Sequence, residues 1–335
     1  MTLYPWQIQS WQQLQHYVTQ YRIPQALLFS GLPGIGKAHL AQQFAFALLC
    51  EQPHLDGQHC GQCRRCLLIA AQTHPDFIVV APQEDTKTQK TKTVIGIDQI
   101  RTLIDKLSLK PQFAQHRVVL IQPADTLNHA AANAFLKYLE EPTERTVLIL
   151  VTHRLHKLPA TIRSRCQKVT LPTPSRALAL PWLEAQLATG QQEADIALTL
   201  AQGAPLIALQ YASEALTAQR RECFHAWLSV ARGQSHPVMV AEQWVALPEE
   251  MLFFWLTAWV IDIMRYHYQD TPKTVYHLDL KKGLSDLAQR VDVVKLYEFY
   301  DFLLKSRTML ETPINKQALW EAILISWARL NQQAR

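Results

Sequence analysis

The sequence lacks any long run of apolar residues. Its most apolar stretch, Met251–Ile261, is interrupted by Thr257 and is followed by Asp262. A membrane-spanning helix needs about 20 consecutive apolar residues, so this stretch predicts a buried helix instead. The first residues also lack a basic segment followed by an apolar core, which argues against a secretory signal. We therefore expect no membrane association and a cytoplasmic location.

A strong charge of either sign is missing as well. The chain has 335 residues, with 33 Lys plus Arg against 28 Asp plus Glu, and a formal net charge of +5. This small excess permits contact with nucleic acid or an acidic partner without arguing for either. A content of 48% apolar and 18% charged residues is ordinary for a soluble globular protein, and the length predicts two or three domains.

Short apolar runs alternate with helical patterns over residues 1–170, which predicts an α/β fold with a parallel sheet covered by helices. β-Branched and aromatic residues mark the expected strands, which are Ala26–Ser30, Phe77–Val80, Val118–Ile121 and Val147–Val151. Apolar residues three and four apart mark the expected helices, which are Lys37–Leu49, Asp98–Leu107 and Asn128–Leu139. The polar run Gln83–Thr93 predicts a solvated surface loop rather than a DNA-binding strip, because it offers nothing to bury.

The pattern changes after Leu171–Pro174, where two prolines predict a stiff junction. From there the chain is expected to be almost wholly helical. We predict a small helical domain over residues 171–211 and a larger one over residues 212–335. Asn315 is placed to cap the last helix, Lys316–Leu330.

Residues 31–38 follow a strand and open a helix, which is the position of a Walker A phosphate loop. In such a loop glycines let backbone N–H groups converge on phosphate oxygens, and a lysine reaches the outer phosphates. Position 38 should carry Ser or Thr to hold Mg²⁺ but is Ala38, so no Mg²⁺ site is expected. Either the loop binds ATP without turnover, or it is a retained anion-binding loop that only shapes the turn. The residues kept are Gly31, Gly34, Gly36 and Lys37.

A working ATPase of this type also needs two carboxylates after a second strand, one for Mg²⁺ and one that activates water. After Val118–Ile121 these two places are taken by Gln122 and Pro123. Glutamine is a poor magnesium ligand, and proline cannot activate water. Asp125 is either a substitute carboxylate or, as the commoner interpretation, an N-terminal helix cap. Hydrolysis by this chain is therefore not expected.

Four of the six cysteines follow the spacing C-x9-C-x2-C-x2-C. In a chain that is not secreted, such cysteines are thiols or metal ligands rather than disulfides. Four thiolates at short intervals suit a structural Zn²⁺ with no open coordination position. An iron–sulfur cluster and a group of buried free thiols are the alternatives. The predicted ligands, in the segment 50–67, are Cys50, Cys60, Cys63 and Cys66.

Two further motifs carry a family resemblance. Residues 133–142 read N-A-F-L-K-Y-L-E-E-P, and residues 164–166 read S-R-C. With the cysteine module, the degenerate phosphate loop and the opening Tyr4-Pro5-Trp6, they make the chain resemble the clamp-loader ATPases of bacterial DNA polymerase III. These are AAA+ proteins, and the decayed motifs resemble those of their non-hydrolysing subunit. The resemblance is dense over the first 170 residues and thinner afterwards.

This resemblance implies an AAA+ core over residues 1–170, a helical lid over 171–211 and an oligomerising collar over 212–335. It also implies a stator that assembles with motor subunits and a clamp-opening subunit, in a complex that loads the sliding clamp onto primed DNA. Arg165 of the S-R-C motif would act in trans as an arginine finger on a neighbour's ATP. Thr152 would occupy the place of the γ-phosphate sensor of active relatives. Without the family match, Arg165 is a surface arginine in a basic run.

Two other functions fit parts of the sequence. One is an ATP-hydrolysing clamp-loader motor subunit with unusual motifs, which predicts ATP turnover that depends on Lys37. The other is a zinc-stabilised nucleic-acid-binding protein in which Arg64 and Arg65 contact DNA, so that binding is sensitive to salt. The missing metal ligands argue against the first function, and the modest positive charge argues against the second.

Overall fold

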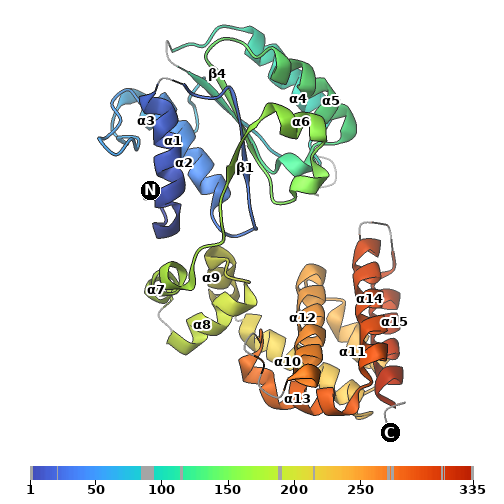
Figure 1. Cartoon of the computed structure of the whole chain (residues 1–335). Coiled ribbons are helices and arrows are strands. Elements are labelled where there is room, and N and C mark those ends of the chain that lie inside the picture. Colours follow the sequence, from blue (N-terminus) through green and yellow to red (C-terminus); the bar gives the residue numbers. More distant parts are fainter. Residues whose placement is uncertain are drawn as a thin grey trace. The chain divides into compact units, whose positions relative to one another are not determined.

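Figure 1 shows the computed structural model of the chain, which describes residues 3–20, 22–83, 94–113, 116–187, 191–213, 216–269, 272, 275–310, 312 and 314–332. The chain divides into two compact units. The first comprises Met1–Trp182 and Gly203–Ile207, and the second comprises Leu183–Gln202 and Ala208–Arg335. The surface loop predicted at Gln83–Thr93 falls, apart from Gln83, outside the described residues.

The first unit contains a parallel five-stranded sheet with the strand order β2-β3-β4-β1-β5. The central strands are buried along their whole length, as expected of a parallel sheet covered on both faces. The four predicted strands are confirmed, and β5 was missed because only Val169 in it is buried. The strands are β1 (Ala26–Ser30), β2 (Phe77–Val80), β3 (Arg117–Ile121), β4 (Thr146–Val151) and β5 (Gln167–Thr170).

Helices cover the two faces of this sheet. Leu28, Val119 and Leu148 share one core with residues of α4, α5 and α6, whereas α2 contacts β1, β3 and β4, and α1 and α3 lie against α2 (Figure 1). The three helices predicted here are confirmed to within one residue at each end. The bounds are α1 (Ile8–Thr19), α2 (Lys37–Leu49), α3 (Arg64–Ala70), α4 (Ile97–Ser108), α5 (His129–Glu140) and α6 (Ala160–Arg165).

After β5 the described chain is helical. The apolar stretch Met251–Ile261 lies in the buried part of α12, as predicted. Asn315 accepts the N–H of Ala318 at 3.3 Å, which confirms it as a cap. These helices are α7 (Arg176–Gln186), α8 (Gln191–Leu200), α9 (Pro205–Ser213), α10 (Leu216–Ala231), α11 (Pro237–Trp244), α12 (Glu249–Tyr268), α13 (Lys281–Arg290), α14 (Val293–Met309) and α15 (Lys316–Gln332).

Tryptophan dominates the core of the second unit. The indoles of Trp227 and Trp327 stack with ring centroids 3.9 Å apart, and Trp320 packs edge-on against Trp244. Such aromatic side chains bury large apolar areas and so carry much of the packing energy. The buried tryptophans of this unit include Trp227, Trp244, Trp255, Trp259, Trp320 and Trp327.

The α/β fold class is confirmed, since a parallel P-loop-type core precedes helical regions. The division of those regions into a lid over residues 171–211 and a collar over 212–335 stays a prediction. Among the described residues, no helix combines the length and the apolar character needed to cross a membrane.

Candidate functional site

The phosphate loop lies between β1 and α2, as predicted. Gly31, Gly34 and Gly36 have φ angles of +147°, +74° and +83°, a conformation that side chains with a Cβ rarely adopt. Gly36 is also the N-cap of α2, so the unpaired N–H groups of the first helical turn lie at the loop. The glycines therefore give this segment the backbone of an anion-binding turn.

Protein contacts hold the carbonyl groups of this loop. Trp6 Nε1 donates to the Ile35 carbonyl at 2.9 Å, and Gln7 Nε2 donates to the next carbonyl at 2.7 Å. At the start of α9, the N–H of Leu206 donates to the Gly34 carbonyl at 3.0 Å. The N-terminal segment and the start of α9 thus help to hold the shape of the loop.

Lys37 is buried inside its own loop. Its side chain is 2% exposed, and Nζ donates to the Leu32 carbonyl at 2.5 Å. Burial lowers the pKa of Lys37 from 10.5 to about 8, because an ammonium group loses its hydration there. The adjacent Ala38 has no hydroxyl group that could hold Mg²⁺. In this structure the lysine thus bonds to a carbonyl group of its own turn.

Asp125 lies in a short 3₁₀ turn after β3 and is buried. Its carboxylate accepts hydrogen bonds from Thr152 Oγ1 at 2.8 Å, from the His153 N–H at 3.1 Å and from Arg154 Nε at 3.1 Å. Burial alone would raise the pKa of Asp125, but these bonds hold it below its ordinary value. The cap interpretation of Asp125 is wrong, because Asn128 caps α5 by accepting the N–H three residues further on at 2.8 Å.

Thr152, which the family resemblance predicts at the sensor position, also has hydrogen-bond partners within the protein. Its hydroxyl donates to Asp125, and its oxygen accepts the N–H of Arg154 at 3.1 Å. Asp125 in turn interacts electrostatically with Lys37. The structure thus brings the phosphate loop, Asp125 and Thr152 together after the carboxyl ends of β1, β3 and β4, where parallel sheets bind ligands. The side chains of Lys37, Asp125 and Thr152 already have partners within the protein.

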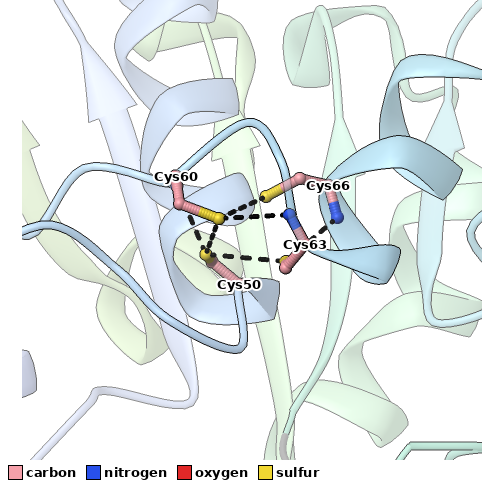
Figure 2. A group of neighbouring side chains, drawn as sticks. All are labelled: Cys50, Cys60, Cys63 and Cys66. Carbon is pink, nitrogen blue, oxygen red and sulfur yellow. Dashed lines mark hydrogen bonds between the residues drawn. The ribbon is translucent and has the colours of Figure 1, made fainter.

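The four predicted metal ligands form one cluster (Figure 2), in which all sulfur atoms lie within 4.8 Å of one another. The Sγ atom of Cys50 is 3.5 Å from that of Cys60 and 3.9 Å from that of Cys63, and Cys60 is 3.9 Å from Cys66. A tetrahedron with Zn–S bonds of about 2.3 Å has edges of about 3.8 Å. The sulfur atoms therefore have the spacing that one metal ion requires.

Backbone N–H groups also point at these sulfur atoms. Cys50 Sγ accepts from the N–H of Cys60 at 3.3 Å, Cys60 Sγ from that of Cys63 at 3.3 Å, and Cys63 Sγ from that of Cys66 at 3.4 Å. Hydrogen bonds from the Gln62 and Cys63 N–H groups lower the pKa of Cys60 to about 6, since they stabilise the thiolate. Such outer bonds orient ligands around a metal.

The cluster and the phosphate loop lie at opposite ends of α2. Cys50 follows the last residue of this helix, and Lys37 is its first residue. Cys63 caps α3 and Cys66 lies within it. At 1.5 Å per residue, the length of α2 separates the two sites by about 20 Å. A metal in the cluster would therefore hold α2, α3 and the connecting loop together, away from the phosphate loop.

Arg165 is the last residue of α6, and its side chain is 36% exposed. Its Nη1 donates to the Thr161 carbonyl at 3.1 Å, and its Nη2 donates to Glu140 Oε1 at 2.5 Å. Ser164 Oγ donates to the same Thr161 carbonyl at 3.1 Å. Cys166 is buried, which raises its pKa to about 11 and makes it a poor nucleophile. In the S-R-C motif, Arg165 thus lies at the surface and Cys166 in the core.

Comparison with known proteins assigns the family. The family model described as DNA polymerase III, delta subunit matches residues 6–175, and the model described as DNA polymerase III, delta subunit, C terminal matches residues 214–329. The delta' subunit of DNA polymerase III from Pseudomonas aeruginosa is 35% identical in an alignment 335 residues long, which covers 98% of this chain and 98% of that protein. The chain belongs to the DNA polymerase III delta' family.

Other relatives agree with this membership. The delta' subunit of Escherichia coli is 30% identical over 328 residues, covering 97% of this chain and 95% of that protein. The tau subunit of DNA polymerase III from Bacillus subtilis is 36% identical over 155 residues, covering 46% of this chain and 26% of that protein.

Sequence reasoning missed two residues of this delta' family member. The sequence suggests Asp125 only as a substitute carboxylate or a cap, although it organises Thr152 and Arg154. Glu140 belongs to the motif at residues 133–142, yet the motif assigns it no role. Its position at the end of α5, next to a motif arginine in space, is a tertiary contact that spacing does not show.

Proposed function

We propose that this chain is the non-hydrolysing stator subunit of the bacterial DNA polymerase III clamp loader. In this role it helps to load the sliding clamp onto primed DNA. The observation that carries the proposal is the match to delta' subunits along the whole length of the chain. Its partners are then the motor subunits and the clamp-opening subunit, with clamp and DNA contacted through the complex, in the cytoplasm.

The geometry of the phosphate loop supports the absence of hydrolysis. Ala38 removes the Mg²⁺ ligand, and Gln122 and Pro123 replace the two carboxylates. Lys37 is turned into its own loop, and the hydroxyl of Thr152 is bound to Asp125. Phosphoryl transfer depends on groups that are free to hold the metal, the phosphate and the attacking water. The loop then serves as a structural turn.

The four-cysteine cluster supports a structural Zn²⁺ site. Cys50, Cys60, Cys63 and Cys66 are free thiols that converge on one point. Four sulfur ligands leave no open position for substrate or water. The ion would stabilise the α2–α3 connection and take no part in the chemistry of ATP.

Arg165 is proposed to act in trans on the ATP of a neighbouring motor subunit. It is exposed, and its guanidinium group is presented at the end of α6. An arginine in such a position can stabilise the charge that develops on the transferred phosphate, and its removal costs about 10³–10⁵ in rate at the site that it serves.

The test is ATP hydrolysis by the reconstituted complex, with clamp and primed DNA present. We expect the lone chain to be inactive and Arg165→Ala to remove from a normally assembled complex the share of ATP turnover that one motor site supplies, because that site fails. The matched control is Arg101→Ala, at an exposed arginine of the same unit. Turnover by the lone chain that depends on Lys37 would instead make it a motor subunit. A complex that is unaffected by Arg165→Ala would contradict the finger.

A further inference from the structure

Glu140 and Arg165 form an ion pair at the surface of the first unit. Each is the last residue of its helix, and the two helices, α5 and α6, pack together. Glu140 Oε1 accepts from Nη2 of the arginine at 2.5 Å, and the Thr161 carbonyl accepts from Nη1 at 3.1 Å. Because the two anchors use different terminal nitrogens, they fix both the position and the plane of the guanidinium group.

Folding stability gives little reason for this pair. The side chains of Arg165 and Glu140 are 36% and 51% exposed, and exposed ion pairs add little to folding stability. The effect on orientation is the more important one, since an unpaired arginine side chain must lose its rotamer freedom when it is ordered. Of the five N–H bonds of a guanidinium group, the two anchors use two. The others are left for a phosphate.

We propose that Glu140 is a positioning residue that orients Arg165 toward the ATP of the neighbouring subunit. The proposal rests on the trans-acting role of Arg165 given above. Glu140 itself touches neither nucleotide nor metal, and it acts only through the arginine. Its carboxylate holds one end of the guanidinium group while the free N–H bonds meet the transferred phosphate. Ordering the side chain beforehand lowers the barrier of the chemical step rather than the affinity for ATP.

The test compares Glu140→Ala and Glu140→Gln with the exposed neighbour Glu141→Ala in the reconstituted complex, again with clamp and primed DNA. Immobilising one flexible side chain is worth about 0.5–1.5 kcal/mol, which is about a two- to tenfold change in rate. We expect Glu140→Ala to slow the site that Arg165 serves by about two- to tenfold. The kcat of the whole complex should therefore fall by no more than in Arg165→Ala, with KM for ATP unchanged. Glu140→Gln keeps a hydrogen-bond acceptor without the charge. Its kcat should lie between those of Glu140→Ala and the wild type. Glu141→Ala should match wild type.

The double variant Glu140→Ala/Arg165→Ala tests whether the glutamate acts through the arginine. We expect it to be no slower than Arg165→Ala alone, because the two residues form one unit. Two results would overturn the inference: a lower rate of ATP hydrolysis in the double variant than in Arg165→Ala, or a Glu140→Ala complex that is as fast as or faster than the wild type. In both cases a slow Arg165→Ala complex would still support the stator function. If Arg165→Ala itself has no effect, the proposed function fails first, and that outcome is distinguishable from failure of the inference alone.

Discussion

Lys37 keeps the place of a phosphate-binding lysine in an environment that disfavours its charge. Its side chain is buried, and the pKa falls from 10.5 to about 8. Between these two pH values the unfolded chain holds a proton that the folded chain has lost. The folded state therefore gains stability as the pH rises through this window, and it carries the cost of a buried charge below it.

Replacing Lys37 with methionine removes this pH dependence and keeps an unbranched side chain that is only one atom shorter. The quantity to follow is the free energy of unfolding of the wild type minus that of Lys37→Met. We expect this difference to increase by up to about 3 kcal/mol between pH 8 and pH 10.5. Denaturant titrations at several pH values measure it. Lys110→Met, at an exposed lysine, is the control, and its difference from the wild type should not change with pH. A difference for Lys37→Met that does not change with pH would show that Lys37 titrates normally in the folded protein.

Cys63→Ser should remove a ligand from the four-cysteine cluster. We expect purified protein to lose its bound zinc, measured by elemental analysis, and Tm to fall by several degrees, because metal binding contributes to folding. Each kcal/mol lost lowers Tm by about 2–4 °C in a unit of this size. Cys223→Ala, at a buried cysteine outside the cluster, should retain the metal. Wild-type protein that contains no metal, or iron in place of zinc, would contradict the assignment.

At the scale of elements, α9 is tied to the phosphate loop through Gly34. A Cβ atom at this position would lie 2.4 Å from Ile207 Cγ1, at a φ of +74°. Gly61 has almost the same φ, +72°, and a Cβ atom added there would have no neighbouring atom within 4 Å. Both glycines carry the same backbone penalty for alanine. They differ in whether the added methyl group meets a neighbouring element.

Gly34→Ala is therefore expected to destabilise the first unit more than Gly61→Ala does. The difference in the free energy of unfolding should be about 1–3 kcal/mol, the usual cost of overpacking. Denaturant unfolding of the two variants measures it. Equal losses would mean that the start of α9 moves away freely and does not stabilise the loop.

Most elements of the first unit could be predicted from the sequence because burial and periodicity coincide there. β1, β3 and β4 are buried at every position, so their apolar runs were unambiguous. β5 lies at the sheet edge with a single buried side chain, Val169, and gave no such signal. The phosphate loop and the cysteine cluster were predictable because their residues are close in sequence. The bonds of Asp125 and Glu140 join distant segments, and a single sequence does not encode that proximity in its spacing.

At the scale of the whole molecule, the residues after 211 have an aromatic core of their own. We expect the fragment 212–335 to be helical and to unfold cooperatively, which circular dichroism during thermal unfolding measures. Trp320→Ala within it should cost about 3–5 kcal/mol, as for other large buried aromatics, and remove the sharp transition. A fragment that unfolds gradually would show that this helical region needs the preceding helices for its stability.

The bonds that hold the phosphate loop also bear on how this lineage can change. If the loop is the structural turn proposed above, the support from Trp6, Gln7 and Leu206 makes its shape independent of nucleotide, and ATP binding does not select its residues. Substitutions such as Ala38 are then neutral with respect to catalysis and can accumulate by drift. Gly34 and Gly36, where a Cβ would meet Ile207 or Gln7, would still be selected for packing. The glycines of this loop should therefore outlast its lysine in evolution.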